Sequence, residues 1–345
     1  MTSTDAIKRI LVIRIDFLGD MLCTTAFLHA LKRRWPDAEL HVLANKYNRA
    51  ALAGNPDVTA VHSYVYSKQF ERNERPGFMA ALVSRFALIR RLRRLRFDLL
   101  IVPNGGMHKN SIRFAQQLGA KDCRWHDVHT EFDDRKPEHV AQRPMRHEAL
   151  SGFRLVPELP WPDEDALRLF VQPDGARRVH WRREFGPKAR PRIGLFVSNR
   201  SAERRWHPSK WRLLAAALHS RADVIVFQDP AGSSSGDDWR DMPVHCATPA
   251  SVADMVAAAS ELDLIVSADS APVHLASALR LPVVALFENR PEKYLRWFPL
   301  GTRHVIVRAE RIVDDIGVDA VEAAIAGLVD ENGQVSDGAS STAAA

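Results

Sequence analysis

The feature that most constrains the fold is a short apolar run near the beginning of the sequence that ends in a glycine turn. Residues 10–15 are Val, Leu and Ile interrupted only by Arg14, and a turn around Gly19 follows them. Such a run is typical of a largely buried strand, and strands of this kind occur in parallel sheets covered by helices. A helix is predicted to follow at residues 20–34. The stretch therefore predicts the first strand, turn and helix of an α/β fold.

The predicted turn carries two carboxylates. In an open α/β sheet ligands bind beyond the carboxyl ends of the strands, so we expect Asp16, Gly19 and Asp20 to line a crevice. The turn lacks the Gly-x-Gly-x-x-Gly motif, and a carboxylate at the helix start would repel a phosphate. Proton abstraction suits a crevice-facing Asp20. The alternative is that Asp20 only caps the helix, because Asp is a favoured N-cap residue and the helix dipole favours a negative charge there.

Length and composition narrow the class of protein. A chain of 345 residues exceeds the usual size of one core, which predicts two domains. No apolar run reaches the roughly 18 residues of a transmembrane helix, and MTSTDAIKR lacks the apolar core of a signal peptide, so we expect a cytoplasmic protein. The three cysteines are far apart, which fits a reducing compartment and argues against a cysteine-rich metal site.

One segment concentrates the positive charge. Residues 85–97, RFALIRRLRRLRF, carry six arginines interleaved with Phe, Leu and Ile at helical spacing. A basic amphipathic helix suits an anionic membrane surface or an acidic substrate, which makes Arg90 and Arg94 candidate acceptor-binding residues. A surface helix that packs its Leu face on the sheet and solvates its arginines is the alternative. Nucleic acid is not an expected partner, because no recognised binding motif accompanies the charge.

Strands and helices alternate in both halves of the chain. Strands are predicted at residues 10–15, 39–44, 58–64, 99–103, 193–198, 224–227, 264–268, 283–287 and 304–307. Helices are predicted at residues 20–34, 47–52, 77–95, 208–221, 252–262, 272–279 and 318–329. A further helix is predicted to start around Lys109 or Asn110, and a short strand to follow near Cys123. This alternation implies right-handed βαβ units and parallel sheets.

The alternation predicts two Rossmann-like, doubly wound α/β domains that face each other across a cleft. The expected domains are residues 1–155 and 156–331, with a Pro-punctuated linker at 153–162. GT-B enzymes and periplasmic binding proteins share this outline. Residues 332–345 are mostly small and polar and are expected to be a disordered tail.

A polar stretch between the two halves, residues 126–147, contains residue types that commonly bind metals. It contains His126, His129 and Glu131, whose spacing matches no helical His-Glu-x-x-His site. We therefore expect no metal there. A long loop near the site can instead recognise the acceptor.

Three loops of the second half follow predicted strands. The first loop carries three guanidinium groups within six residues, and the paired N–H donors of a guanidinium match phosphate oxygens. The candidate donor-binding residues of this loop are Ser198, Asn199, Arg200 and Arg204. The second opens a helix whose free N–H groups can seat a diphosphate; its candidates are Asp269, Ser270, Ala271 and His274. The third offers Glu288 to ribose or sugar hydroxyls. The alternatives are solvated arginines, an N-cap at Asp269 and Ser270, and a packing role for His274.

Three separated motifs carry a family resemblance. RIDFLGDMLCTTAFLHALKRRWPDAELHVLANKYNRAAL followed by NPDV resembles the N-terminal signature of glycosyltransferase family 9, the ADP-heptose:lipopolysaccharide heptosyltransferases. RRWHPSKW and VSADSAPVHLASALRLPVVALF resemble its donor-binding signatures. The resemblance implies a GT-B fold and an inverting transfer from a nucleotide-activated heptose, without a metal, to the inner core of lipopolysaccharide.

The resemblance also assigns roles. The family's catalytic aspartate follows the Gly of the first loop, which makes Asp20 the base. Its phosphate-binding Lys is Arg204 here, a departure that keeps the charge, and His274 matches the family's His. Its Asp-Ser/Thr-Gly reads Asp-Ser-Ala at residues 269–271, and the missing Gly limits how closely the backbone approaches a phosphate.

The implied partners are a nucleotide-sugar donor, with ADP-heptose first, and a glycolipid acceptor at the anionic inner membrane. Two other functions stay open. One is a transferase of the same fold that uses another nucleotide-sugar for O-antigen, capsule or another glycan. The other is a nucleotide-sugar-binding protein that has lost catalysis. A dehydrogenase is disfavoured, because neither half has a Gly-x-Gly-x-x-Gly motif.

Overall fold

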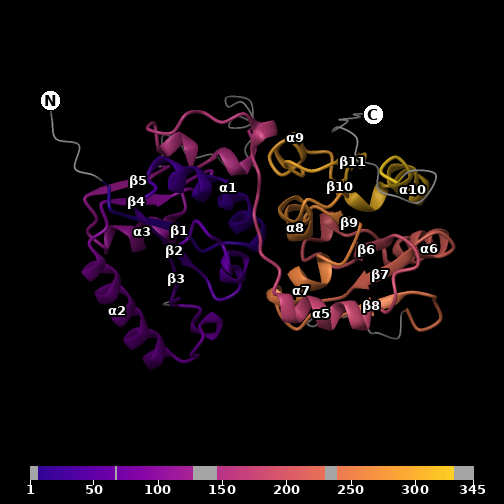
Figure 1. Cartoon of the computed structure of the whole chain (residues 1–345), viewed down its shortest axis with the longest axis horizontal. Coiled ribbons are helices and arrows are strands. Elements are labelled where there is room, and N and C mark those ends of the chain that lie inside the picture. The colour runs from indigo at the N-terminus through magenta and orange to yellow at the C-terminus, as the bar shows by residue number, and fades with distance from the viewer. Residues whose placement is uncertain (1–6, 67, 127–145, 230–238, 330–345) are drawn as a thin grey trace. The chain divides into compact units, whose positions relative to one another are not determined.

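The computed structural model describes residues 7–66, 68–126, 146–229 and 239–329. His129, Glu131 and the predicted tail at 332–345 lie outside the described residues. The chain divides into two compact units, Met1–Asp163 and Glu164–Ala345, each built on its own sheet (Figure 1). The predicted α/β class with two parallel sheets is confirmed.

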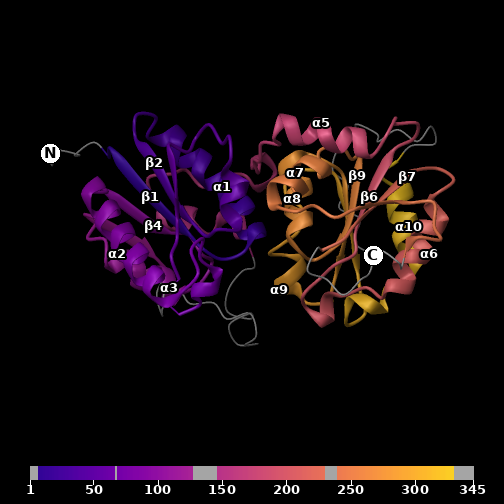
Figure 2. The same ribbon diagram turned by 90° about the horizontal axis from the view of Figure 1, so that it is seen from below.

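The first unit contains a five-stranded parallel sheet in the order β3-β2-β1-β4-β5. Its strands are β1 (Arg9–Arg14), β2 (Glu39–Ala44), β3 (Ala60–Ser63), β4 (Leu99–Val102) and β5 (Asp122–Trp125). Its helices are α1 (Leu18–Arg34), α2 (Phe78–Leu95) and α3 (Lys109–Gln116), with 3-10 turns that include η1 (Asn48–Leu52), η3 (Glu148–Leu150) and η4 (Phe153–Leu155). Figure 2 shows α1 on one face of the sheet, and α2 and α3 on the other.

Helix α1 is buried on almost every side. From Leu18 to Leu28 each residue is buried except Asp20, because the sheet covers one side of the helix and the η3–η4 segment covers another. Phe27 packs edge-on against Phe153 with ring centroids 5.4 Å apart, and Gly152 lies against the same Phe27 ring. The predicted linker thus contributes Phe153 to the core of the first unit, and the η3–η4 segment is held beside the start of α1.

The second unit contains a six-stranded parallel sheet in the order β11-β10-β9-β6-β7-β8. Its strands are β6 (Arg192–Phe196), β7 (Asp223–Phe227), β8 (His245–Ala247), β9 (Leu264–Ala268), β10 (Val283–Phe287) and β11 (His304–Arg308). Its helices are α5 (Gly175–Glu184), α6 (Pro208–Leu218), α7 (Val252–Ala259), α8 (Ala271–Leu279), α9 (Pro291–Tyr294) and α10 (Val318–Ala326). Helices α6 and α10 share one face of this sheet with a core that includes Trp206 and Trp211.

The sequence prediction missed α5, β8 and α9. Helix α5 reads GARRVHWRRE, in which only two large apolar residues occur and only Trp181 is buried, so it lacks the apolar stripe that marks a helix. The other two elements are three and four residues long, too short for a periodic signal. Among the described helices, none has the length and apolar character needed to cross a membrane.

Candidate active site

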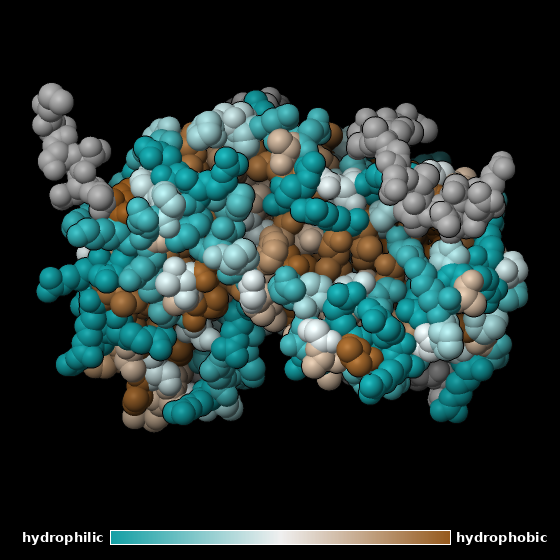
Figure 3. Space-filling model, viewed as in Figure 1, coloured by the Kyte–Doolittle hydropathy of each residue, from teal (hydrophilic) through white to brown (hydrophobic). Residues whose placement is uncertain are grey.

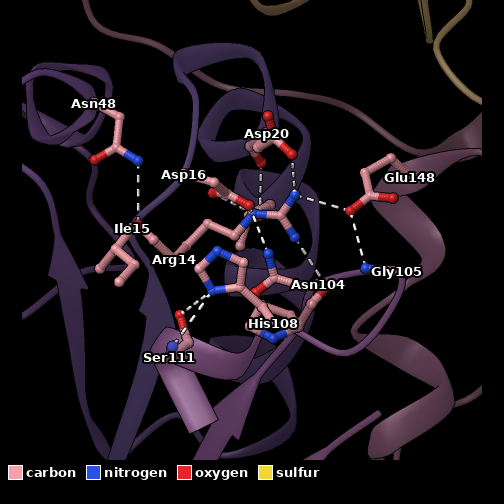
Figure 4. Close-up of polar contacts among 12 residues, drawn as sticks. Arg14, Ile15, Asp16, Asp20, Asn48, Asn104, Gly105, His108, Ser111 and Glu148 are labelled. Carbon is pink, nitrogen blue, oxygen red and sulfur yellow. Dashed lines mark hydrogen bonds and ion pairs between the residues drawn. The ribbon is translucent and has the colours of Figure 1, made fainter. Parts of the chain in front are cut away.

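The carboxyl end of β1 carries a buried arginine that binds three carboxylates (Figure 4). Arg14 is the last residue of β1, and its side chain is 1% exposed. Its Nη2 donates to Oδ1 of Asp20 at 2.5 Å and to Oε1 of Glu148 at 2.8 Å. Its Nε lies 2.9 Å from Oδ1 of Asp16. One guanidinium thus gathers three acidic side chains.

Four segments of the first unit supply this cluster. Asp16 lies in the loop after β1, Asp20 in the first turn of α1, and Glu148 in η3. After β4, the Asn104 side chain donates to Oδ2 of Asp16 at 2.6 Å, and the amide of Gly105 donates to Oε1 of Glu148 at 3.1 Å. Parallel β1 and β4 are neighbours, so their carboxyl ends meet at one edge, where α/β proteins bind ligands.

Asparagine side chains hold the loop after β1 in place. Asn45 Nδ2 donates to the carbonyls of Ile15 and Asp16, at 2.9 and 2.6 Å, and Asn48 Nδ2 donates to the carbonyl of Arg14 at 3.1 Å. Both asparagines are buried. The carboxylates therefore project from a backbone that is fixed by hydrogen bonds.

The interpretation of Asp20 as a helix cap is wrong. Helix α1 begins at Leu18 with Phe17 as its N-cap, because Leu18 and Gly19 are already helical, so Asp20 is the third helical residue. Gly19, which was expected to line a crevice with the two aspartates, is buried in that first turn. Asp16 and Asp20 both contact Arg14. The positive end of the helix dipole remains favourable for the Asp20 charge.

Sequence reasoning missed Arg14 and Glu148 as site residues. A signal for Arg14 was present, because a charge within an apolar strand must find partners when it is buried. Glu148 had no such signal. It is 134 residues from Arg14 in the sequence and lies beside the predicted linker, and only the packing of η3 against α1 brings it to the cluster.

The charges of the cluster shift the pKa values of its members. Burial raises the pKa of Asp16 to about 8, aided by the charges of Asp20 and Glu148 and opposed by Arg14. Burial lowers the pKa of Arg14, but the three carboxylates more than reverse this, so its pKa is raised. Burial, with the charge of Arg14, lowers the pKa of His108, the N-cap of α3. The cluster therefore has a charged Arg14, an Asp16 that binds a proton more tightly than an ordinary aspartate, and a His108 that favours its neutral form.

Exposure separates the roles of the three carboxylates. The side chain of Glu148 is 2% exposed, whereas those of Asp16 and Asp20 are 12% and 15% exposed. A partly exposed carboxylate that is held by a fixed guanidinium can accept a proton from a hydroxyl group. Asp20 is the most exposed of the three and lies in the first turn of α1, so it is the better placed base.

The two candidate arginines of α2 are not brought to Asp20. The carbonyl of Leu95, at the end of α2, accepts a hydrogen bond of 3.1 Å from Nη1 of Arg9, at the start of β1. Arg90 and Arg94 therefore lie towards the amino edge of the sheet, whereas Asp20 follows the carboxyl end of the same strand.

In the second unit, the loops after β6 and β9 meet at Arg204. Its Nη1 lies 3.2 Å from the carbonyl of Asp269 and 3.3 Å from Oδ2 of the same residue. Asn199 Nδ2 donates to the same carbonyl at 3.1 Å. Burial raises the pKa of Asp269, against the lowering effect of Arg204 and Lys293. The structure thus joins two of the predicted donor loops.

The start of α8 offers backbone donors beside this guanidinium. Ser270 is the N-cap, but its side chain bonds the carbonyl of Ala268 at 3.0 Å and does not cap the helix. The first amides of a helix have no partner within the helix, and Ala271 opens this one. His274 is buried one turn later, edge-on to Trp297 at 5.7 Å.

The remaining donor candidates are less closely joined to Arg204. Glu288 is buried after β10, with Oε1 3.9 Å from Nη1 of Arg290. Ser198 Oγ accepts a hydrogen bond of 3.3 Å from the amide of Asp229. Arg200 is exposed, and its carbonyl accepts from Arg205.

Comparison with known proteins identifies the family. The model of glycosyltransferase family 9 (heptosyltransferase) matches residues 85–315. The chain is 23% identical over 290 residues to lipopolysaccharide heptosyltransferase 3 of Escherichia coli, with 79% of this chain and 81% of that protein covered.

Two solved structures share the fold. One is the glycosyl transferase family 9 protein from Veillonella parvula, with a TM-score of 0.75, 16% identity, and 92% and 96% of the two chains covered. The other is E. coli heptosyltransferase WaaC with ADP-2-deoxy-2-fluoro heptose, with a TM-score of 0.65, 15% identity, and 92% and 98% covered. Since the family match spans more than half of the sequence, the chain belongs to glycosyltransferase family 9 and is a glycosyltransferase with the GT-B fold.

Proposed function

We propose that the chain transfers a heptose from ADP-heptose to an acceptor in the inner core of lipopolysaccharide, with inversion and without a metal. The observation that carries the proposal is the partly exposed Asp20 carboxylate on the buried Arg14 cluster. The named relatives support the donor and acceptor, since one is a lipopolysaccharide heptosyltransferase and the structure of another contains ADP-2-deoxy-2-fluoro heptose.

The proposed reaction is a single displacement. Asp20 takes the proton of an acceptor hydroxyl as that oxygen attacks the anomeric carbon of the donor. The new glycosidic bond forms on the face opposite the breaking bond to the diphosphate oxygen, so the anomeric configuration inverts. The leaving group is ADP, and the proton remains on Asp20 until solvent removes it.

The second unit is proposed to bind the diphosphate. Arg204 and the amides of Ser270 and Ala271 supply positive charge and hydrogen-bond donors, and His274 lies in the following turn. Asn199 fixes the Asp269 carbonyl that Arg204 also contacts. A fixed guanidinium can stabilise the negative charge that develops on the leaving diphosphate, which is why we propose a reaction without a metal.

The acceptor is proposed to be a glycolipid at the cytoplasmic face of the inner membrane, which makes the enzyme a cytoplasmic protein with peripheral membrane contact. Asp16 and Gly19 remain the proposed acceptor-side residues next to Asp20. Arg90 and Arg94 can act only on a part of the acceptor, or of the membrane, that extends towards the amino edge of the sheet.

A transfer assay tests the chemistry. ADP-heptose and heptose-deficient lipopolysaccharide are incubated with wild type, Asp20→Asn and the exposed control Asp37→Asn, and the product is analysed by NMR. We expect Asp20→Asn to lower transfer by at least about a hundredfold, as for loss of a general base, while ADP still binds. Retention of configuration, or loss of transfer on adding EDTA, contradicts the mechanism.

A thermal-shift assay tests the donor. ADP, GDP, UDP, CDP and NAD are compared, and a ligand at about a hundred times its dissociation constant adds roughly 2.7 kcal/mol. We expect ADP to stabilise the wild type and the control Arg183→Ala, but not Arg204→Ala. Stabilisation by GDP or UDP instead overturns the donor assignment. Binding of ADP-heptose without any transfer indicates a nucleotide-sugar-binding protein that lacks catalysis.

A further inference from the structure

Helix α2 exposes a stripe of large apolar side chains. Five residues of its first half are between 45% and 68% exposed: Phe78, Met79, Leu82, Val83 and Phe86. Positions three and four apart lie on the same side of a helix, so these residues form one continuous face, hereafter the α2 stripe. Figure 3 shows brown side chains among the teal ones over this helix, at the lower left.

The α2 stripe is not the face that packs on the sheet. Ala81, Leu88 and Leu92 are buried on another side of the helix, and Leu88 and Leu92 belong to the core of the first unit. The expected packing of a Leu face is therefore confirmed. The exposed stripe is additional, and burial in the core of the first unit does not explain it.

The α2 stripe lies at the same edge of the sheet as Asp20. Arg85 donates to the carbonyl of Val65 at 2.9 Å and packs over the ring of Tyr64, and both residues follow the carboxyl end of β3. The other end of α2 reaches Arg9, at the start of β1. The turns before Arg85 therefore extend beyond the carboxyl edge, by roughly 10 Å at a rise of 1.5 Å per residue.

Basic residues accompany the stripe. Helix α2 contains five arginines and no carboxylate. At helical spacing, Arg90 and Arg94 continue the exposed side towards the end of the helix, and neither has an ion-pair partner among the described residues. In the segment before the helix, Lys68 and Arg75 are exposed together with Glu71 and Glu74, so the excess of positive charge comes from the helix itself. An apolar face flanked by unpaired cations complements the anionic surface of a lipid bilayer.

We propose that the α2 stripe inserts into the surface of an anionic phospholipid bilayer and that the arginines bind its phosphate groups. The helix lies in the plane of the interface, with its apolar side chains among the acyl chains. The inserted stripe belongs to the first half of α2, which is the end of the helix nearer to the Asp20 edge. The functional reason for docking to a membrane rests on the proposed glycolipid acceptor. Docking itself does not involve the transfer reaction, so the two can be tested separately.

Co-sedimentation of the full chain with vesicles tests the docking. We expect wild type to bind vesicles of phosphatidylcholine with phosphatidylglycerol, and to bind phosphatidylcholine alone more weakly. Met79→Gln/Val83→Gln/Phe86→Gln should weaken binding roughly tenfold or more, because binding scales with buried apolar area. These side chains are exposed, so the fold should tolerate the changes.

Matched controls separate the stripe from general surface effects. Val179→Gln/Leu213→Gln removes exposed apolar residues of the second unit and should bind vesicles as wild type does. Arg90→Gln/Arg94→Gln should lower binding about fivefold for each charge removed.

Three outcomes overturn the docking proposal. The first is that wild type does not sediment with anionic vesicles, and the second is that the stripe variant binds vesicles as wild type does. The third is that wild type is a dimer and the stripe variant a monomer, since a second copy of the chain then covers the stripe. Loss of vesicle binding with full transfer to a detergent-dispersed acceptor supports docking independently of the chemistry. Full vesicle binding without transfer counts against the proposed function alone.

Discussion

Replacing Arg14 with Met removes the buried cation that binds the three carboxylates of the cluster. The guanidinium atoms lie 2.5, 2.8 and 2.9 Å from Asp20, Glu148 and Asp16, and both Arg14 and Glu148 are at most 2% exposed. Breaking a buried ion pair by removing one partner costs about 3–5 kcal/mol. Total stabilities of domains are about 5–15 kcal/mol, so Arg14→Met should remove a large share of the stability of the first unit.

The loss of stability in Arg14→Met should depend on pH. Without the guanidinium, the buried carboxylates bind protons more tightly in the native than in the unfolded state. Unfolding then releases protons, so stability rises as pH falls and is lost as pH rises. We expect the deficit relative to wild type to be larger near pH 8 than near pH 5. Urea unfolding, followed by circular dichroism, measures both values.

Arg192→Met provides the matched control in the second unit. Arg192 is also buried, but its guanidinium donates to the carbonyl of Gly186 and lies over the Phe185 ring, so its removal leaves no carboxylate cluster behind. This variant should lose stability by an amount that changes little with pH. A loss below about 1 kcal/mol for Arg14→Met, or a loss that does not grow with pH, refutes the assignment of Arg14 as the charge that holds the cluster together.

Two further substitutions test other parts of the first unit. Burial raises the pKa of Asp16 to about 8, so the native state binds a proton more tightly than the unfolded state does, and this residue lowers stability as pH rises towards 8. The melting temperature of Asp16→Asn should therefore rise relative to that of wild type as pH increases. The exposed control Asp37→Asn should show no such trend. A Cβ at Gly152 would lie 2.6 Å from the Phe27 ring, so Gly152→Ala should cost about 1–3 kcal/mol in urea unfolding. Gly175→Ala, which meets nothing within 4 Å, should cost nothing.

The sequence was sufficient to predict elements whose signal is local. Apolar runs such as β4 (Leu99–Val102) mark strands that are buried on both faces, and their alternation with helices predicted parallel sheets in both units. The same reasoning placed Asp16 and Asp20 after β1, and Arg204 and Asp269 after β6 and β9, because each follows directly from strand order. Helix α5 was not predicted, because it packs against α7 with only one buried residue, a tryptophan, and so lacks an apolar stripe.

The composition of α2 does not show at which edge of the sheet its arginines lie. Charge density suggested Arg90 and Arg94 as acceptor residues, but a helix between two parallel strands runs antiparallel to them. Its last turns therefore lie at the amino edge of the sheet, as the hydrogen bond from Arg9 to Leu95 shows. The exposed apolar stripe appears only in the structure, because the sequence does not distinguish an apolar residue on the sheet face from one on the outer face.

The sequence by itself therefore determined the fold class and the loops that hold the candidate site residues, because strand order and local periodicity encode both. Only the tertiary structure decided which charges share the site. Glu148 reaches Arg14 because the η3–η4 segment packs on α1 through Phe153 and Phe27. That packing, rather than any local pattern, adds the buried Glu148 to the partly exposed Asp16 and Asp20 at the Arg14 guanidinium. Arg14 and Glu148 are separated by 134 residues in the sequence. A local sequence pattern does not show that two such distant residues are in contact, because the contact depends on tertiary packing.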